Sequence, residues 1–120
     1  MIGFDIIEKN DFESQGIKFI SIKGYLDAHT VTQLEEKLYS MLNKGVKKIL
    51  IDFSDLKYIS SAGIGLLIGA TQKIRAEGGD LVICNSSDKV YNILENLGFT
   101  KIFNIAHSEQ EALSLFTKKS

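Results

Sequence analysis

Hydrophobic and polar residues alternate along parts of this chain with the period of a β-strand. Residues 2–8 alternate in polarity, as a half-buried strand does. A polar turn over 10–16 separates them from a second strand-like run over 17–24, so the two runs predict a β-hairpin. The segments 47–53 and 80–84 each contain a short continuous apolar run and predict buried strands.

Other segments repeat their apolar residues with helical spacing. Within 24–45 this spacing runs from Val31 to Leu42, and the other segments are 60–79, 88–97 and 108–116. Gly45, Gly78 and Gly98 are expected to end the first three helices, and Ser108 with Glu111 has the spacing of a capping box that starts the fourth. The residues between the last two helices, 99–105, predict a short strand or an extended segment.

The alternation of strands and helices after residue 17 predicts parallel strands joined by right-handed crossovers. The expected fold is α/β, a single domain over 1–120 with a small, mixed but mostly parallel sheet, an N-terminal hairpin and about four helices. The strands at 17–22 and 48–53 then point the same way, and the loops after them emerge at one edge of the sheet. That edge is where open α/β sheets carry their sites.

Composition and charge narrow the classes of function. The chain has 120 residues, 44% of them hydrophobic, and a net charge of −1, so nothing favours nucleic acid or an anionic membrane as a direct partner. Its N-terminus lacks the basic and apolar regions of a signal peptide, and no apolar run approaches the roughly 20 residues of a spanning helix. The single cysteine, Cys84, is predicted to be a buried filler. We therefore expect a cytoplasmic protein.

Signatures of enzymes, metals and cofactors are weak. The sequence has no phosphate loop, no HExxH and no paired cysteines, and its two histidines lack partners at metal-binding spacing. The glycines of 63–69 follow GxGxxxG, one residue longer than a dinucleotide fingerprint, and no acid follows the next strand. We interpret Gly65 and Gly69 as one small face on which the helix approaches the sheet. Asp52 and Asp55 are better explained as turn-forming residues than as an acid/base pair.

Two adjacent serines, Ser60 and Ser61, lie where a strand feeds a helix. A hydroxyl at this N-cap position can accept a bond from a free backbone N–H and stabilise the helix by about 1 kcal/mol. The same position suits a phosphoryl group, because free donors and the helix dipole favour an anion there. Asp27 and His29, in the loop after the 17–24 strand, are expected to come near these serines. The residues alone leave both readings open, a plain helix cap and a phosphorylation switch.

Two motifs resemble those of a known family. The segment DFSDLKYISSAGIGLL, residues 52–67, is similar to the signature of STAS domains, specifically the single-domain anti-sigma factor antagonists. GYLDAHT, residues 24–30, matches a second family motif of the form G-x-L-D. The similarity continues through residues 78–105 and so covers nearly the whole chain.

The resemblance implies a regulatory mechanism without an enzymatic activity or a cofactor. The unphosphorylated antagonist binds a serine-kinase anti-sigma factor, which releases its sigma factor; the kinase then phosphorylates the antagonist, and a PP2C-type phosphatase reverses this. The phosphorylated serine of the family corresponds to Ser61. The resemblance also implies that a surrounding group lies near this site, namely Asp27, Ser60, Asp52 and Gly63. Ile64, Leu67 and His29 are expected at the partner interface, although the two aliphatic residues could instead pack the helix on the sheet.

This chain departs from the family pattern at one position, and two other functions remain open. Many members have Asp-Ser where this chain has Ser60-Ser61, so Ser60 is a competing acceptor. The same sheet edge could hold a small molecule or nucleotide, which would make the domain a ligand sensor or a scaffold component without phosphoryl switching. A hydrolase using Asp27, Ser61 and His29 needs a geometry that the sequence does not establish.

Overall fold

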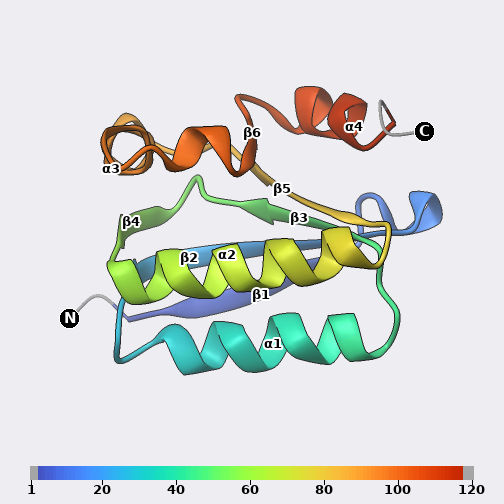
Figure 1. Cartoon of the computed structure of the whole chain (residues 1–120), viewed down its shortest axis with the longest axis horizontal. Helices are drawn as coiled ribbons and strands as arrows, with labels where there is room; N and C mark the ends of the chain where they lie inside the picture. Colours follow the sequence, from blue (N-terminus) through green and yellow to red (C-terminus); the bar gives the residue numbers. More distant parts are fainter. Residues whose placement is uncertain (1–2, 118–120) are drawn as a thin grey trace.

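A mixed β-sheet forms the centre of the fold (Figure 1). The computed structural model describes residues 3–117. Within them the strands are β1 (Asp5–Lys9), β2 (Ile17–Leu26), β3 (Lys48–Asp52), β4 (Leu56–Ile59), β5 (Asp80–Cys84) and β6 (Asn104–Ala106). The α-helices are α1 (Val31–Asn43), α2 (Ser61–Ala76), α3 (Asp88–Asn96) and α4 (Glu109–Thr117), and the short 3-10 helices are η1 (Glu13–Gln15) and η2 (Phe99–Lys101).

The strand order confirms the predicted architecture. β1 and β2 pair antiparallel, and the remaining pairs of the order β1-β2-β3-β5-β6 are parallel. The predicted first strand, 2–8, is shifted in the structure to Asp5–Lys9, and residue 2 lies outside the described residues. The segment 99–105, predicted as one short strand or extended piece, contains η2 and the start of β6.

The sequence did not predict β4, which lies in the segment that we expected to be a polar loop. Ile17–Ser21 of β2 pairs with β3, and Gly24–Leu26 of β2 pairs with β4, with a register shift between Gly24 and Tyr25. β3 and β4 therefore lie one after the other along β2. Leu56 and Ile59 of β4 are buried, and this burial is what gives such a short strand a fixed place. β4 therefore runs beside the last part of β2, and the two strands end next to each other.

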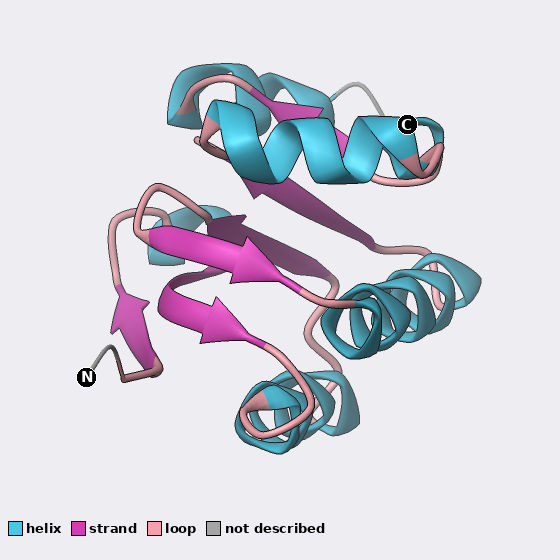
Figure 2. Cartoon of the chain, turned by 90° about the vertical axis from the view of Figure 1, so that its left-hand side faces the viewer, coloured by secondary structure: helices cyan, strands magenta, loops and turns pink. Residues whose placement is uncertain are grey.

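The helices cover both faces of the sheet (Figures 1 and 2). α1 and α2 pack on one face, over side chains such as Ile20, Ile51 and Ile83. α4 packs on the other face, over Phe19 and Leu50. Because neighbouring residues of β3 and β5 enter opposite cores, both strands are continuously apolar, as parallel strands covered on two faces are. α3 packs against β4 at one end of the molecule.

Two local predictions are confirmed by the contacts. Cys84 is fully buried, and burial, followed by the nearby charge of Asp52, raises the pKa of its thiol to about 12, so the thiol stays protonated. At the start of α4, the backbone N–H of Glu111 donates to Ser108 Oγ at 3.0 Å, and the N–H of His107 donates to Glu111 Oε1 at 2.8 Å. The first bond is the one predicted for a capping box; the returning bond of Glu111 reaches the N–H of His107, one residue before Ser108.

The glycines of α2 do not form the close-packing face that the sequence suggested. Gly65 is exposed, and a Cβ added there would meet nothing within 4 Å. A Cβ on Gly69 would face the Tyr39 hydroxyl of α1 at 3.4 Å. The close approach to the sheet is at Gly63 instead, where a Cβ would lie 2.6 Å from Leu26 Cγ. The helix therefore presents a different side to the sheet than the glycine spacing indicated.

A buried carboxylate joins α2, β5 and β6. Asp80 Oδ1 accepts from Arg75 Nε at 3.0 Å, and Asp80 Oδ2 accepts from Asn104 Nδ2 at 2.6 Å. Burial alone would raise the pKa of Asp80, but the bonds from Arg75 and Asn104 outweigh it and hold the pKa below its ordinary value. Asp80 therefore remains ionised in the folded protein down to a lower pH than in the unfolded chain.

Acidification is expected to destabilise the wild type more than an Asp80→Asn variant. Because the folded-state pKa lies below the unfolded value, the carboxylate stabilises the fold above about pH 4, and this stability is lost as the pH falls through the folded-state pKa. Thermal unfolding midpoints measured from about pH 7 to about pH 3 check this. Parallel curves for the two proteins would show that Asp80 carries no such linkage.

Candidate functional site

The two serines at the junction of β4 and α2 lie in different environments. Ser60 is the N-cap of α2, and its backbone N–H donates to the carbonyl of Leu26 at 2.9 Å. Its hydroxyl makes no capping bond, is buried, and has no hydrogen-bond partner among residues 3–117. Ser61 is the first residue of α2 and is exposed. Of the two serines, Ser60 thus holds the cap position, and Ser61 is the serine that solvent and a partner can reach.

The loop after β2 lies beside this junction. Leu26 at the end of β2 pairs with Ile59 at the end of β4, so the next residues of the two strands, Asp27 and Ser60, begin neighbouring loops. This confirms the expected convergence at one edge of the sheet. Neither the pairing of β2 with β4 nor the bond from Ser60 to Leu26 was part of that prediction.

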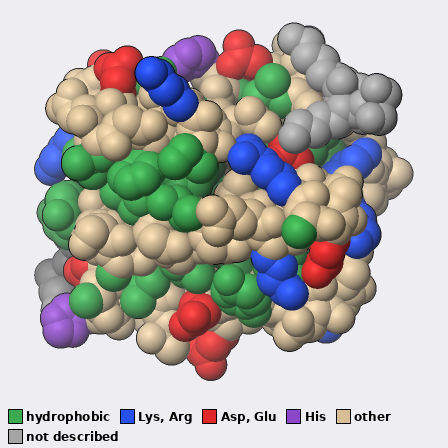
Figure 3. All heavy atoms as spheres, in the orientation of Figure 1, with side chains coloured by type: hydrophobic (Ala, Val, Ile, Leu, Met, Phe, Trp, Pro, Cys, Tyr) green, Lys and Arg blue, Asp and Glu red, His purple; other side chains and the backbone are tan. Residues whose placement is uncertain are grey.

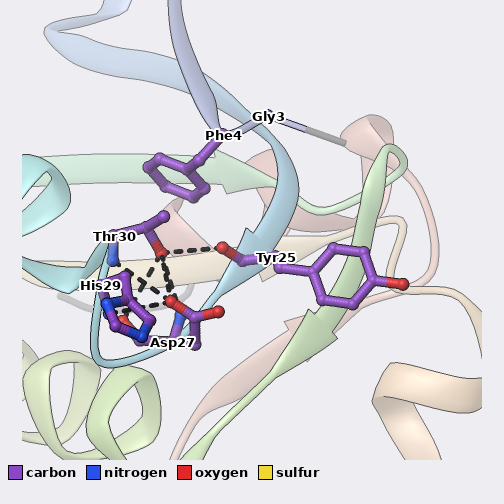
Figure 4. A pocket seen from close by; sticks show the side chains of 6 residues that line it. All are labelled: Gly3, Phe4, Tyr25, Asp27, His29 and Thr30. Carbon is purple, nitrogen blue, oxygen red and sulfur yellow. Dashed lines mark hydrogen bonds between the residues drawn. The ribbon is translucent and has the colours of Figure 1, made fainter. Parts of the chain in front are cut away.

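Asp27 and Thr30 fix the conformation of this loop (Figure 4). Asp27 Oδ1 accepts from the backbone N–H of His29 at 2.9 Å and from that of Thr30 at 3.2 Å. Thr30 Oγ1 accepts from the N–H of Asp27 at 2.9 Å and donates to the carbonyl of Tyr25 at 2.7 Å. These bonds hold the loop in one shape ahead of α1 and leave the His29 side chain exposed.

A groove of about 440 Å³ opens next to the loop. Its lining consists of Gly3, Phe4, Tyr25, Asp27, His29 and Thr30. Figure 4 shows the Phe4 ring near Thr30, while the Tyr25 ring points away toward β4. There it lies 6.0 Å from the Tyr58 ring, and both tyrosines are more than a third exposed. Sequence reasoning missed Phe4 and the two tyrosines as surface features. For Tyr25 the available signal was an aromatic residue on the polar side of its strand, whereas Phe4 is partly buried against the core and gave no such signal.

Ile64 and Leu67 do not form the partner interface that the resemblance suggested. Their exposed fractions are 2% and 0%, and both belong to the main core between α2 and the sheet. The alternative expectation, packing of the helix on the sheet, is the one that the structure confirms. Gly63 is also buried at the start of α2, close to Leu26.

Asp52 was expected near the phosphorylation site, but its bonds belong to another part of the sheet. Its carboxylate accepts from Ser54, from Asn85 Nδ2 at 3.2 Å and from Lys9 Nζ at 3.4 Å. Because Leu50, two residues earlier on β3, packs under α4, Asp52 points to that same face and away from α1 and α2. Burial would raise the pKa of Asp52, but these hydrogen bonds and the Lys9 charge lower it, so Asp52 is a structural carboxylate.

The arrangement offers no catalytic constellation. The side chains of Ser61 and His29 make no hydrogen bond with each other in the described part of the chain, and Asp27 holds the backbone of His29 instead of its ring. Residues 3–117 contain no group of three or more His, Cys, Asp or Glu side chains that could bind a metal ion. In the same range no helix has the length and apolar character needed to cross a membrane.

Comparison with known proteins gives consistent matches over most of the chain. The family model of the STAS domain matches residues 10–112. BtrV of Bordetella bronchiseptica, a candidate anti-sigma factor antagonist, is 31% identical over 84% of this chain and 87% of its own length. The anti-sigma-B factor antagonist of Staphylococcus aureus is 30% identical over 73% of this chain and 83% of its own length.

A solved structure shows the same fold. The Bacillus cell fate determinant SpoIIAA in its phosphorylated form superposes with a TM-score of 0.68 at 23% identity, covering 94% of this chain and 98% of that one. The shared fold includes the mixed sheet, the antiparallel β1–β2 pair and the four helices of the described chain.

Proposed function

The chain belongs to the STAS domain family, and from this premise we propose that it is an anti-sigma factor antagonist switched by phosphorylation of Ser61. In the unphosphorylated form it binds a serine-kinase anti-sigma factor in the cytoplasm and so frees a sigma factor. The kinase phosphorylates Ser61 and ends the association, and a PP2C-type phosphatase restores the binding form. The family assignment makes the chain a regulator and not an enzyme.

The observation that carries this proposal is the difference between the two serines. A kinase must reach the hydroxyl that it modifies, and Ser61 is exposed while the Ser60 hydroxyl is buried. Ser60 is further held by the bond from its N–H to Leu26. The occurrence of a phosphorylated form of SpoIIAA, which has the same fold, supports a switch of this type.

The start of α2 can accept the added charge without unfolding. A phosphoryl group brings about −1.5 to −2 charges at neutral pH. The positive end of the helix dipole favours this charge, and the first turn of α2 carries no acidic residue to oppose it. Phosphorylation is therefore expected to change what the surface binds while the fold persists.

Loss of partner binding follows from the same charge. A partner that covers the neutral Ser61 hydroxyl must remove water from the contact, and desolvating a doubly charged group without a matching cation is unfavourable. The added oxygens also occupy space that the partner would fill. Both effects act at the exposed surface of the α2 start, beside the rigid Asp27 loop.

The proposal is tested by mapping phosphate after incubation with ATP and purified serine-kinase anti-sigma factors of the same organism. The wild type and Ser60→Ala are expected to gain one phosphate at Ser61, and Ser61→Ala is expected to gain none. Phosphate on Ser60, or no phosphate with any of these kinases, would contradict the switch. The second result would favour the other candidate function, in which the groove beside Phe4 and Asp27 binds a small ligand.

A further inference from the structure

One flank of α2 joins Ser61 to an apolar surface at the other end of the helix. Residues seven apart on an α-helix lie on nearly the same side, so Ser61, Ile68 and Arg75 form one line. Arg75 Nη1 donates to the carbonyl of Ile102, just after η2, at 2.9 Å. The side of α2 that carries these three residues therefore faces η2. Ser61 therefore stands at one end of the space between α2 and the α3–η2 segment.

Apolar residues lie on both sides of this space, and Leu97, four residues after Ile93, lies on the same side of α3 as Ile93. Ile68 of α2, Ile93 of α3 and Phe99 of η2 are only partly buried where they pack against the core. Leu97, after α3, is 58% exposed, and Ile102 is 39% exposed. Figure 3 shows a broad hydrophobic area on this face, between α2 and the segment above it. We refer to these five residues as the α2–α3 surface.

Charged residues also lie on the segments that carry the α2–α3 surface. Glu95 and Lys101, of opposite charge, are exposed on the same segments as Leu97 and Ile102. Single exposed apolar residues are common on proteins, but a broad hydrophobic area such as the one in Figure 3 is typical of a contact site. Because Glu95 and Lys101 are of opposite charge, they give no reason to expect a strongly charged partner.

We propose that the α2–α3 surface is a second part of the docking site for the same anti-sigma factor, and that it takes an apolar segment of that protein. The inference rests on the proposed function and on continuity, since Ser61 lies on the flank of α2 that borders this surface. A specific interface buries about 800 Å² on each partner, which one serine and the Asp27 loop cannot supply. The partner must therefore cover additional surface next to Ser61. Along α2, the apolar surface next to Ser61 is the α2–α3 surface.

The Leu97→Asp variant tests the proposal, with Asn96→Asp as its matched control. Both variants add one negative charge at the end of α3, but only the first removes apolar surface. Binding is measured by titration calorimetry with the purified anti-sigma factor that phosphorylates Ser61. Leu97→Asp is expected to raise the Kd about tenfold or more, and Asn96→Asp by less than about twofold. Leu97→Ser, which adds no charge, is expected to fall between them.

The outcomes separate this inference from the proposed function. Because Leu97 is largely exposed, the unfolding midpoint of Leu97→Asp is expected to match that of Asn96→Asp. Equal affinities of the two variants for the anti-sigma factor would overturn the inference and leave the Ser61 switch standing. A wild-type dimer in sedimentation that Leu97→Asp dissolves would assign the surface to a second copy and also overturn it. If no serine-kinase anti-sigma factor binds the wild type, the proposed function fails, and the inference fails with it.

Discussion

The Ser61→Asp variant is expected to bind the anti-sigma factor about a hundredfold more weakly than the wild type, a loss of about 2.7 kcal/mol. Ser61 is exposed at the first position of α2, so an added carboxylate lies in the contact instead of in the core. The partner then has to desolvate a charge that no cation of this chain neutralises within the first turn of α2. Calorimetric titration of the unphosphorylated anti-sigma factor with the purified variant measures the effect.

Ser61→Ala is the matched control for this charge. It is expected to keep wild-type affinity, because removing an exposed hydroxyl leaves no buried group unpaired, and it cannot be switched off by the kinase. Both variants are expected to unfold within a few degrees of the wild type, since an acidic residue in the first turn of a helix is favourable. Equal affinities of Ser61→Asp and Ser61→Ala would exclude electrostatic control at this position.

Gly63→Ala is expected to lower the free energy of unfolding by about 1–2 kcal/mol. The new Cβ would lie 2.6 Å from Leu26 Cγ and 3.1 Å from Ile59 Cγ1, both in fully buried side chains that cannot move away. Overpacking of this kind costs more than the roughly 1 kcal/mol that alanine gains over glycine inside a helix. Urea denaturation of the two proteins measures the difference.

Gly65→Ala provides the comparison, because it makes the same substitution two residues further along α2. A Cβ at this position meets nothing within 4 Å, so only the gain in helix propensity remains. The variant is expected to be more stable than the wild type by up to about 1 kcal/mol. If both variants shift stability in the same direction, the close approach of α2 to the sheet at Gly63 is not as described.

The strands and helices were predictable where burial on one or both faces imposes a regular hydrophobic pattern on the sequence. β3 and β5 are covered on two faces, which makes them continuously apolar, and the capping box at Ser108 is a local motif. β4 was not predictable, because its four residues alternate only once and its place depends on pairing with the distant end of β2. Short strands of this kind are defined by their partner and not by their own sequence.

The candidate site was predictable in outline but not in its details. Parallel strands bring the Asp27 loop and the two serines to one edge of the sheet, which follows from topology alone. Which serine caps α2 depends on the β2–β4 register, since that register sets the bond from Ser60 to Leu26. The direction of Asp52 depends on which face of β3 lies under α4. The identity of the capping serine and the direction of Asp52 both depend on pairing between segments far apart in the sequence. No local sequence pattern predicts such pairing.

The central claim is that the phosphate state of Ser61 controls this protein, and phosphopeptide mass spectrometry of the protein from its own cells tests it most directly. The protein would be recovered from growing and from stressed cultures, and the occupancy of phosphate on Ser61 measured in each. We expect phosphate on Ser61, absent from Ser60, with an occupancy that differs between the two conditions. A complete absence of phosphate from Ser61 in both cultures would contradict the claim and leave Ser61 as an ordinary first residue of α2.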